Sequence, residues 1–402
     1  MSQRKKYKSM KRKTKKLKVD VVNRYYYPVV AGIETLLTNV YPHLACKGWD
    51  VTIHVSKNTL SQKKILKDEE EINKVKVKRY YLGLFGFSPK IDWQNTSIVN
   101  IFNFDVFPHV RILLYCLILK YLGMKKFTLI LSPQGGFTPE WSLFKPLSRV
   151  LKRIYHYTMG TYLINQVVDL VVAVSTWEKL ELERKGVMKP QIVILPNGIE
   201  AEAYKNVDML VSKHIEKKLT KIGKYIIQVG RIHPIKNYEC SIKAVSKLPN
   251  SIKLVIVGPV VDSVYKRRIS SLIKQLGLED RIIFLGMVSN IDKYFLMKHA
   301  QMMIHTSLNE SFCHVVNEAM SQGQICVVSD NSALPYLIEG GVNGYLVETH
   351  NYQGFANKIS YVMEHSKSEI IRKMRNQNRK HALRYSWVNI GNKVDHLYRS
   401  SI

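Results

Sequence analysis

The stretch Tyr225–Lys236, with the sequence YIIQVGRIHPIK, joins a short apolar run to a loop that opens with glycine. A continuous apolar run of this length predicts a parallel strand that is buried on both faces. The loop carries Arg231 and Lys236, so both cations follow the carboxyl end of the predicted strand. This placement suits a pyrophosphate, because arginine can make a bidentate contact and lysine supplies a point charge. On charge alone, two surface cations in a lysine-rich chain are the simpler interpretation.

A second candidate site follows another predicted strand, Met302–Thr306. The apolar residues after it repeat at helical spacing and predict a helix from about Cys313 to Gly323. Unpaired backbone N–H groups at the start of a helix bind phosphate readily. Glu310 precedes this helix and could reach a sugar beyond the phosphate, whereas Glu318, two turns into it, could accept hydrogen bonds from ribose. For two acids taken alone, a helix cap and a solvated helix acid are the better interpretation.

Similar apolar runs recur along the chain, separated by segments of helical length, and fall into two series. Two such series predict two doubly wound α/β domains, with the hinge in the polar segment 200–224. The charged segment 68–79 is interpreted as a solvated surface element. The predicted strands are Val19–Val22, Val51–Val55, Ile98–Asn103, Phe127–Leu131, Leu170–Val174 and Ile192–Leu195 in the first series, and Tyr225–Val229, Lys253–Val257, Arg281–Leu285, Met302–Thr306, Ile325–Val328 and Tyr345–Val347 in the second.

The composition is that of a globular protein with two domains. Of 402 residues, 46% are hydrophobic and 23% charged, which excludes a disordered chain, a collagen and a coiled coil. The longest apolar stretch, Ile112–Leu119, is far shorter than the roughly 20 residues of a spanning helix. The five cysteines are scattered without a CxxC pair, so we expect buried thiols in a reducing cytosol, without disulfides or a zinc site.

The net charge is strongly positive, because 61 Lys and Arg residues stand against 31 Asp and Glu residues. The excess of +30 attracts polyanions such as nucleic acid, anionic lipid head groups or phosphorylated small molecules. Residues 1–18 hold ten basic side chains and no acid, so we expect a disordered tail and no secretory signal. No helix-turn-helix, zinc-finger or RNP-like motif supports a nucleic-acid-binding protein, which is suggested only by the charge.

The two pairs Arg231/Lys236 and Glu310/Glu318, each after a strand of the second series, resemble the retaining GT-B glycosyltransferases of family 4. No single motif is decisive, but their order and spacing together are specific. The resemblance extends from about residue 19 to the end of the chain. The further motifs that carry it are Tyr25–Pro28 with Ala31-Gly32-Ile33-Glu34, Val174-Ser175 with Glu178, Leu195–Glu200, Val257-Gly258-Pro259, Phe284-Leu285-Gly286, Gly341–Gly344 and Tyr385-Ser386-Trp387.

The resemblance implies the GT-B architecture, in which two Rossmann-like domains face each other across a cleft. The expected parts are a basic tail (1–18), an acceptor domain (19–200), a nucleotide-sugar donor domain (201–384) and a C-terminal helix that crosses back (385–402). It also implies a set of site residues without a metal ligand. These are Glu310, Arg231 and Lys236 for catalysis, Gly32, Gly230, Gly258, Gly286, Ser311, Phe312, Cys313 and Glu318 for the donor, and Gln134 and Gly135 for the acceptor or sugar.

Two departures from the family pattern concern this site. Gln134 stands where many relatives have a histidine that contacts the sugar, and glutamine does not titrate near pH 7, which puts a proton-relay role there in doubt. Cys313 replaces a common glycine and is expected to narrow the phosphate seat by one side chain.

Several absent motifs narrow the chemistry. The histidines show neither HxH nor HExxH spacing, so no metal site is expected. The chain lacks Asp-x-Asp, with which glycosyltransferases of the other major fold hold a divalent ion against the leaving diphosphate. This agrees with Arg231, Lys236 and a helix N-terminus neutralising that charge. The absence of Gly-x-Gly-x-x-Gly argues against an NAD enzyme.

The resemblance therefore implies a metal-independent enzyme that transfers sugar from a UDP- or GDP-sugar to a glycan or lipid-linked acceptor with retention of configuration. The expected role is in cell-surface polysaccharide or glycolipid synthesis, and no further cofactor is expected. A nucleotide-sugar epimerase of the same fold is the alternative enzyme, and it would consume donor without an acceptor.

A membrane partner is expected on two grounds. Family relatives often act on lipid-linked acceptors, which implies a cytoplasmic protein on the inner face of the membrane. In addition, the segment Phe144–Tyr157 interleaves basic and apolar residues, a pattern typical of helices that lie on anionic bilayers. The alternative, that this helix packs its apolar side on the N-terminal sheet, stays open.

Overall fold

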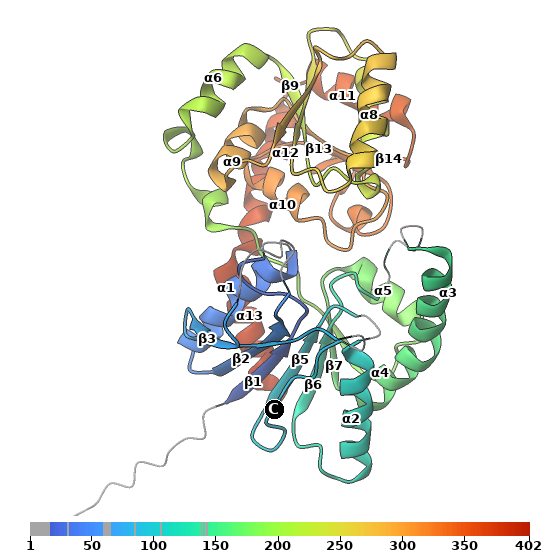
Figure 1. The fold of residues 1–402 in the computed structure, drawn as a ribbon. Helices are drawn as coiled ribbons and strands as arrows, with labels where there is room; N and C mark the ends of the chain where they lie inside the picture. Colours follow the sequence, from blue (N-terminus) through green and yellow to red (C-terminus); the bar gives the residue numbers. More distant parts are fainter. Residues whose placement is uncertain are drawn as a thin grey trace, which may run out of the picture.

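The computed structural model describes residues 17–29, 32–58, 66–83, 86–104, 107–137, 139, 141 and 144–402. Within these ranges the chain forms two α/β domains, the N-terminal one below the C-terminal one in Figure 1. The prediction of two doubly wound parallel-sheet domains is confirmed. All twelve predicted strands are present, with ends that differ from the prediction by one residue at most. The basic tail lies outside the described residues except for its last two positions.

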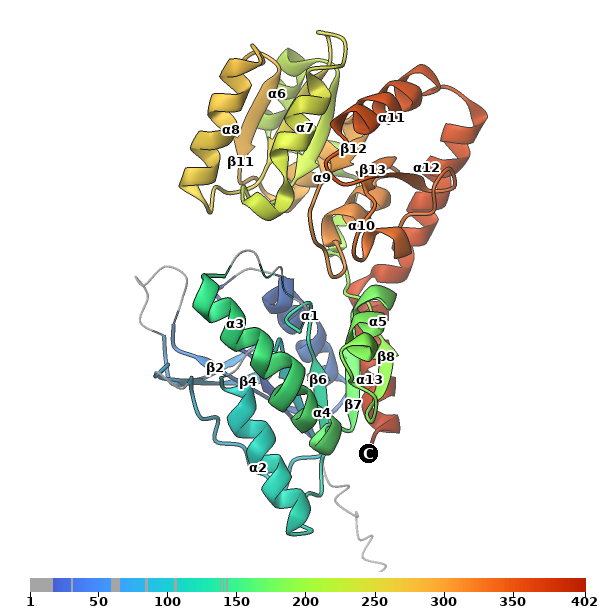
Figure 2. The same cartoon turned by 90° about the vertical axis from the view of Figure 1, so that its right-hand side faces the viewer.

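The N-terminal domain is built on an eight-stranded sheet with the order β3-β4-β2-β1-β5-β6-β7-β8. Helices α1 and α13 cover one face, and α2, α4 and α5 cover the other (Figures 1 and 2). The strands are β1 (Lys18–Val22), β2 (Asp50–Ser56), β3 (Glu69–Ile72), β4 (Val75–Tyr80), β5 (Ile98–Phe102), β6 (Thr128–Ser132), β7 (Leu170–Ala173) and β8 (Gln191–Ile194). The helices are α1 (Gly32–Cys46), α2 (His109–Tyr121), α3 (Pro146–Tyr155), α4 (Thr161–Val167) and α5 (Thr176–Arg184), with a π-helical turn, η2 (His156–Gly160), between α3 and α4.

The charged segment 68–79 is part of this sheet, so its interpretation as a solvated surface element is wrong. Strand β4 lies parallel to β2, and β3 pairs antiparallel with β4 at the sheet edge. Val75 and Val77 are fully buried beneath charged residues that alternate with them. This is the period-two pattern of a half-buried strand. The density of charge concealed the alternation.

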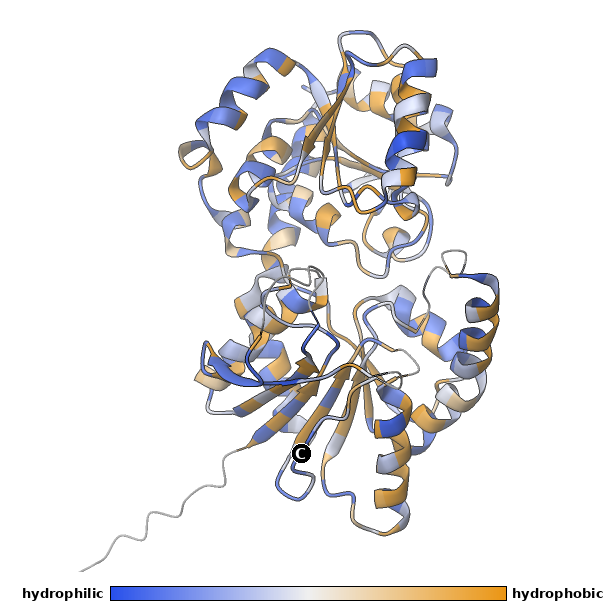
Figure 3. Cartoon of the chain, viewed as in Figure 1, coloured by the Kyte–Doolittle hydropathy of each residue, from blue (hydrophilic) through white to orange (hydrophobic). Residues whose placement is uncertain are grey.

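The C-terminal domain has a six-stranded parallel sheet with the order β11-β10-β9-β12-β13-β14. Apolar residues dominate the C-terminal sheet and the central strands of the N-terminal sheet, whereas the edge strand β3 is mostly polar and the outer helices mix polar and apolar positions (Figure 3). The strands are β9 (Tyr225–Val229), β10 (Lys253–Val257), β11 (Ile282–Gly286), β12 (Met303–His305), β13 (Cys326–Ser329) and β14 (Gly344–Val347). The helices are α6 (Lys213–Ile222), α7 (Tyr238–Val245), α8 (Ser263–Gln275), α9 (Asn290–His299), α10 (His314–Ser321), α11 (Tyr352–Glu364) and α12 (Glu369–Ala382), with short 3₁₀ turns η3 (Ala201–Tyr204), η4 (Val207–Met209), η5 (Pro234–Lys236), η6 (Leu334–Tyr336) and η7 (Leu383–Tyr385).

The strand order fixes where a ligand can bind. In the upper sheet β9 lies between β10 and β12, so the order reverses at β9 and β12. In the lower sheet the same reversal occurs at β1 and β5. Ligands of open α/β sheets bind at such switch points, beyond the carboxyl ends of the strands. The loops after β9 and β12 are the two that the sequence analysis singled out.

The chain crosses between the domains twice, and the two crossings lie side by side. Ile199 donates a backbone hydrogen bond of 2.7 Å to Tyr385, and Trp387 packs so closely on Gly198 that a Cβ there would lie 2.5 Å from the indole. After the second crossing, α13 (Trp387–Ser400) packs on α1, and its Tyr398 hydroxyl hydrogen-bonds that of Tyr41 at 2.8 Å. The last helix is therefore part of the N-terminal domain.

The structure bears on two expectations from the sequence, buried cysteine thiols and the lack of a stretch long enough for a spanning helix. All five cysteines are free thiols, and four of them are buried, but Cys46 is exposed. Among the described residues, no helix is long and apolar enough to cross a bilayer.

Candidate active site

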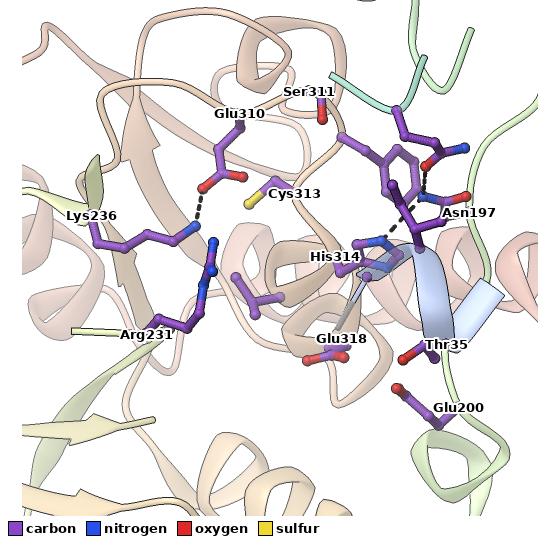
Figure 4. Close-up of a pocket in the computed structure, with 16 residues that line it drawn as sticks. Thr35, Asn197, Glu200, Arg231, Lys236, Glu310, Ser311, Cys313, His314 and Glu318 are labelled. Atoms are coloured by element: carbon purple, nitrogen blue, oxygen red, sulfur yellow. Dashed lines mark hydrogen bonds and ion pairs between the residues drawn. The ribbon is translucent and has the colours of Figure 1, made fainter. Parts of the chain in front are cut away.

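A pocket of about 360 Å³ opens between the two domains, at the switch points of both sheets. Figure 4 shows Arg231, Lys236 and Glu310 at one end of it and Thr35, Asn197 and Glu200 at the other. The lining residues are Gly32, Ile33, Thr35, Gln134, Asn197, Glu200, Gly230, Arg231, Lys236, Glu310, Ser311, Phe312, Cys313, His314, Val315 and Glu318.

The N-termini of two helices meet in this pocket. Helix α1 begins at Gly32 and α10 at His314, and a Cβ on Gly32 would lie 3.7 Å from His314 Nε2. The first N–H groups of a helix have no partner within it and carry the positive end of its dipole. Two such ends in one pocket favour an anion with several oxygens. The predicted start of α10 near Cys313 is correct.

Two cations from the loop after β9, Arg231 and Lys236, lie at one end of the pocket. Lys236 Nζ lies 2.5 Å from Glu310 Oε1, with both side chains largely buried. Arg231 is exposed to the pocket, and no carboxylate pairs with it among the described residues. Lys236 therefore holds Glu310 in place, while the guanidinium of Arg231 is available for a bound anion.

Glu310 is kept ionised by its surroundings. Burial alone would raise its pKa, but the charge of Lys236 and a hydrogen bond from His305 hold the pKa well below its usual range. His305 Nε2 lies 2.8 Å from Glu310 Oε1, and His305 itself is fully buried. Glu310 thus presents a carboxylate at any pH near neutrality.

Cys313 takes a backbone conformation that normally favours glycine. Its φ is 64°, in the left-handed region, and its thiol is buried with Sγ 3.3 Å from His305 Nε2. Ligand atoms of His305, Glu310 and Cys313 lie within 4.8 Å of one another. Imidazole, thiolate and carboxylate together can bind soft divalent cations. The absence of an HxH spacing in the sequence did not predict this cluster. Metal independence therefore stays a prediction.

On the N-terminal side of the pocket, uncharged residues fit closely against the C-terminal domain. Asn197 Nδ2 donates to Gln134 Oε1 at 2.8 Å and lies 3.2 Å from His314 Nε2, so one amide links both domains. Gly135, with φ +85°, lies so near the other domain that a Cβ would stand 2.8 Å from Ser311 Oγ. These contacts place Gln134 at the interface between the two domains.

A buried acid supports the Gln134–Gly135 loop from behind. Glu178 is fully buried and accepts hydrogen bonds from the backbone N–H groups of Gly135 and Val174. Burial raises its pKa to about 7, against the lowering effect of those two hydrogen bonds. Glu178 thus fixes the loops after β6 and β7 relative to each other.

Most predicted site residues gather in the pocket. Gly135, Gly258 and Gly286 are not among its lining residues; Gly258 instead packs under Gly230, where a Cβ would lie 2.1 Å from the carbonyl oxygen. Sequence reasoning missed Asn197 and His314 as individual site residues. Asn197 lies in the motif Leu195–Glu200, and His314 is the first residue of α10. Their positions in this motif and at this helix start were the sequence features that could have identified them.

Two family models match the chain. The model described as "Glycosyltransferase Family 4" matches residues 30–203, and that described as "Glycosyl transferases group 1" matches residues 212–381. Together they cover both domains and the pocket between them.

Curated relatives align with part of the chain. "N-acetyl-alpha-D-glucosaminyl L-malate synthase" of Bacillus anthracis is 30% identical over 200 residues, 49% of this chain and 50% of the relative. "D-inositol 3-phosphate glycosyltransferase" of Mycolicibacterium smegmatis is 30% identical over 166 residues, 41% of this chain and 37% of the relative. The alignment thus spans half or less of the relatives' own length.

Solved structures share the fold over nearly the whole chain. Sucrose-phosphate synthase from Thermosynechococcus elongatus superposes with a TM-score of 0.76 at 17% identity, covering 96% of this chain and 98% of its own. Anabaena HepE in complex with UDP-glucose superposes with a TM-score of 0.72 at 19% identity, covering 96% of this chain and 100% of its own. From the two family models and this fold, the chain belongs to the GT-B glycosyltransferases of family 4, group 1.

Proposed function

We propose that this protein transfers a sugar from a nucleotide-diphosphate sugar to a hydroxyl of a glycan or lipid-linked acceptor, with retention of anomeric configuration. The observation that carries the proposal is the convergence of Arg231, Lys236 and the N-termini of α1 and α10 on one interdomain pocket. That arrangement suits a diphosphate, and a diphosphate is the leaving group of such donors.

The difficult step is departure of the nucleotide diphosphate from an oxocarbenium-like sugar. Arg231 and the helix N–H groups stabilise the charge that develops on the leaving oxygens. One such group typically contributes about 3–4 kcal/mol, or a hundred- to a thousand-fold in rate. Glu310, ionised and anchored by Lys236 and His305, lines the same pocket, and we assign it to the sugar of the donor. Closure of the two domains over the substrates would exclude water, which competes with the acceptor.

The relatives guide the choice of donor and acceptor. One relative is named as an N-acetyl-alpha-D-glucosaminyl L-malate synthase and another as a D-inositol 3-phosphate glycosyltransferase, and HepE was solved in complex with UDP-glucose. The HepE complex supports UDP-sugars as the first donors to test. We propose further that no divalent metal is required, because cations and helix termini already occupy the place where a metal would act.

A panel of nucleotides tests the donor. UDP, GDP and ADP and their glucose conjugates are added to the protein in a thermal-shift assay, and a bound nucleotide raises Tm by mass action. The nucleotide that binds is then offered as labelled sugar donor with and without acceptor glycans. Consumption of intact donor without acceptor, giving an isomeric sugar, would favour the epimerase. Failure of every nucleotide to shift Tm would contradict the proposal.

A membrane-bound acceptor is supported by helix α3. Only Tyr155, at its end, packs against the core, so the alternative that the helix packs its apolar side on the sheet is wrong. Its four apolar residues Leu147, Val150, Leu151 and Ile154 are 53–73% exposed, beside Arg149, Lys152 and Arg153. We propose that this face and the basic residues 1–18 rest on an anionic membrane surface.

Vesicle sedimentation tests the membrane contact. The variant Leu147→Ser/Leu151→Ser is compared with Ile370→Ser, an equally exposed apolar position on α12 of the other domain. We expect the α3 variant, and deletion of residues 1–18, to reduce binding to vesicles that contain anionic lipid, and we expect salt to weaken binding of the full chain. Binding equal to that of the unaltered chain would exclude the altered segment from membrane attachment.

A further inference from the structure

Lysine 293 lies between two acids of the nucleotide pocket. Its Nζ is 2.9 Å from Glu318 Oε1 and 4.0 Å from Glu200 Oε2, and its side chain is only 15% exposed. Glu318 and Glu200 both line the pocket, whereas Lys293 reaches them from α9, behind the lining. One amine thus contacts an acid on α10 and an acid at the crossing between the domains.

Glu318 is bound through one oxygen. Its Oε1 receives the bond from Lys293, whereas its buried Oε2 has no hydrogen-bond partner among the described residues. A buried carboxylate oxygen without a partner is costly unless a ligand supplies a donor. Lys293 therefore fixes one half of the carboxylate and leaves the other half for a hydroxyl in the pocket.

Glu200 is fixed from the same helix. The hydroxyl of Tyr294, next to Lys293 on α9, donates to Glu200 Oε2 at 2.7 Å. Glu200 follows Ile199, which pairs with the second crossing of the chain. Lys293 and Tyr294 thus tie the donor-side helix α10 to the interdomain segment.

Lys293 favours the ionised form of Glu318 against the effect of burial. Burial raises the pKa of Glu318 to about 7; the charge of Lys293 lowers this pKa, and the charge of Glu200 raises it. Four other charged or titratable groups surround this pair: Glu202 and Tyr294 beside Lys293, His314 one turn earlier on α10, and Arg231 across the pocket. Two further cations, Arg375 and Arg379 of α12, lie near Gly323, beyond the far end of α10. Lys293 is the cation in direct contact with Glu318.

We propose that Lys293 is a positioning residue, which keeps Glu318 ionised and oriented so that Glu318 can accept a hydrogen bond from the ribose of the bound nucleotide. The inference rests on the proposed function, because it names the ribose as the ligand of Glu318. Lys293 itself does not touch the nucleotide. Its removal changes affinity through the charge state of Glu318.

The test compares Lys293→Met with Lys298→Met. Lys298 lies on the same helix but pairs with Asp208 away from the pocket. Without Lys293, we expect the pKa of Glu318 to rise further, so that a larger fraction of the carboxyl is protonated at pH 7.5. A protonated carboxyl accepts a weaker hydrogen bond from ribose than a carboxylate does. We expect Lys293→Met to weaken UDP binding about tenfold at pH 7.5, by titration calorimetry, and to recover towards the unaltered protein at pH 9.5 as the carboxylate forms. Both pH values lie above the phosphate ionisation near pH 6.

Lys298→Met should bind UDP as the unaltered protein does at both pH values. Lys293→Arg, which keeps the charge, should restore most of the affinity at pH 7.5. On a Glu318→Gln background, Lys293→Met should cause no further loss, because the group through which it acts is absent. A loss that is equal at both pH values, or a loss below threefold, would overturn the proposal.

A stability measurement gives a readout without nucleotide. A carboxyl whose pKa is higher in the folded than in the unfolded protein stabilises the folded state at pH values below its unfolded pKa. This stabilisation is lost as the pH rises through the folded pKa. The Tm of Lys293→Met should therefore fall further below that of the unaltered protein at pH 9.5 than at pH 6.5. If no nucleotide binds the unaltered protein, the proposed function fails, whereas a constant Tm difference overturns the charge link itself.

Discussion

The two walls of the pocket are built on different principles. The wall from the C-terminal domain carries Arg231, Lys236, Glu310 and Glu318, three of them held in buried or half-buried ion pairs. The wall from α1 and the loop after β6 offers Gly32, Ile33, Thr35 and Gln134, and none of these lining residues is charged. Charge is needed where a diphosphate leaves, and shape where a hydroxyl approaches. Variants of the two walls should therefore differ in the size of their effect and in the kinetic parameter that changes.

The largest effect is expected for the cations. Arg231→Ala and Lys236→Ala should each reduce kcat/KM a hundred- to a thousand-fold, because each removes charge stabilisation from the leaving diphosphate or from Glu310. Steady-state kinetics with a labelled donor measures this. Lys247→Ala, an exposed cation of the same domain, is the matched control and should leave activity unchanged. A variant that keeps more than about a tenth of the activity would exclude that residue from the clamp, since tenfold is only about 1.4 kcal/mol.

The two acids of the charged wall should separate kinetically. Glu310→Gln keeps the shape but removes the carboxylate that Lys236 and His305 hold, so kcat should fall about a hundredfold. Glu318→Gln should raise the donor KM about tenfold with little change in kcat, because a ribose hydrogen bond is at stake. Initial rates over a range of donor concentrations measure both. Equal losses of kcat with unchanged nucleotide affinity would show that the roles are assigned wrongly.

Much of the charged wall could be predicted from the sequence. Arg231 and Lys236 follow β9, and Glu310 precedes α10, so a strand pattern and a helix pattern were enough to place them at one sheet edge. The packing role of Gly258 could not be predicted, because only the folded structure reveals that its missing Cβ makes room for the carbonyl oxygen of Gly230, in the loop after β9. The prediction failed for segment 68–79, where charged residues on the exposed face masked a buried strand face.

The long-range contacts of the site could not be predicted. Lys293, Glu200 and Glu318 are far apart in sequence, and their ion pairs form only because α9 packs on α10 and on the turns η3 and η4 that follow the first crossing. Likewise, Asn197 contacts Gln134 and His314 of different domains. Local patterns carry no information on such pairings. They depend on how two complete domains meet.

A smaller effect is expected on the uncharged wall. Gly135→Ala puts a methyl group 2.8 Å from Ser311 Oγ of the opposite domain and strains a backbone with φ +85°. The domains must then separate slightly, so kcat/KM should fall about tenfold. Gly123→Ala is the matched control, because its φ is +65° and nothing lies within 4 Å. Kinetics should be unaffected in that variant, with a similar loss of Tm. If both variants had the same kinetics, close approach at Gly135 would have no role.

The smallest effect is expected on removal of metal. If, as proposed, the cations of the charged wall and the two helix N-termini stabilise the leaving diphosphate, dialysis against EDTA should change kcat less than twofold. The one complication within the described residues is the trio His305, Glu310 and Cys313, whose ligand atoms lie within 4.8 Å. Lys236 already neutralises Glu310 there, and a divalent ion on Glu310 would compete with that ion pair. Mg²⁺ and Mn²⁺, which prefer oxygen ligands, should therefore not stimulate turnover.

Metal content is measured on the same dialysed sample. A tenfold loss of kcat that an added divalent ion restores would contradict metal independence and would assign part of the work of the charged wall to an ion.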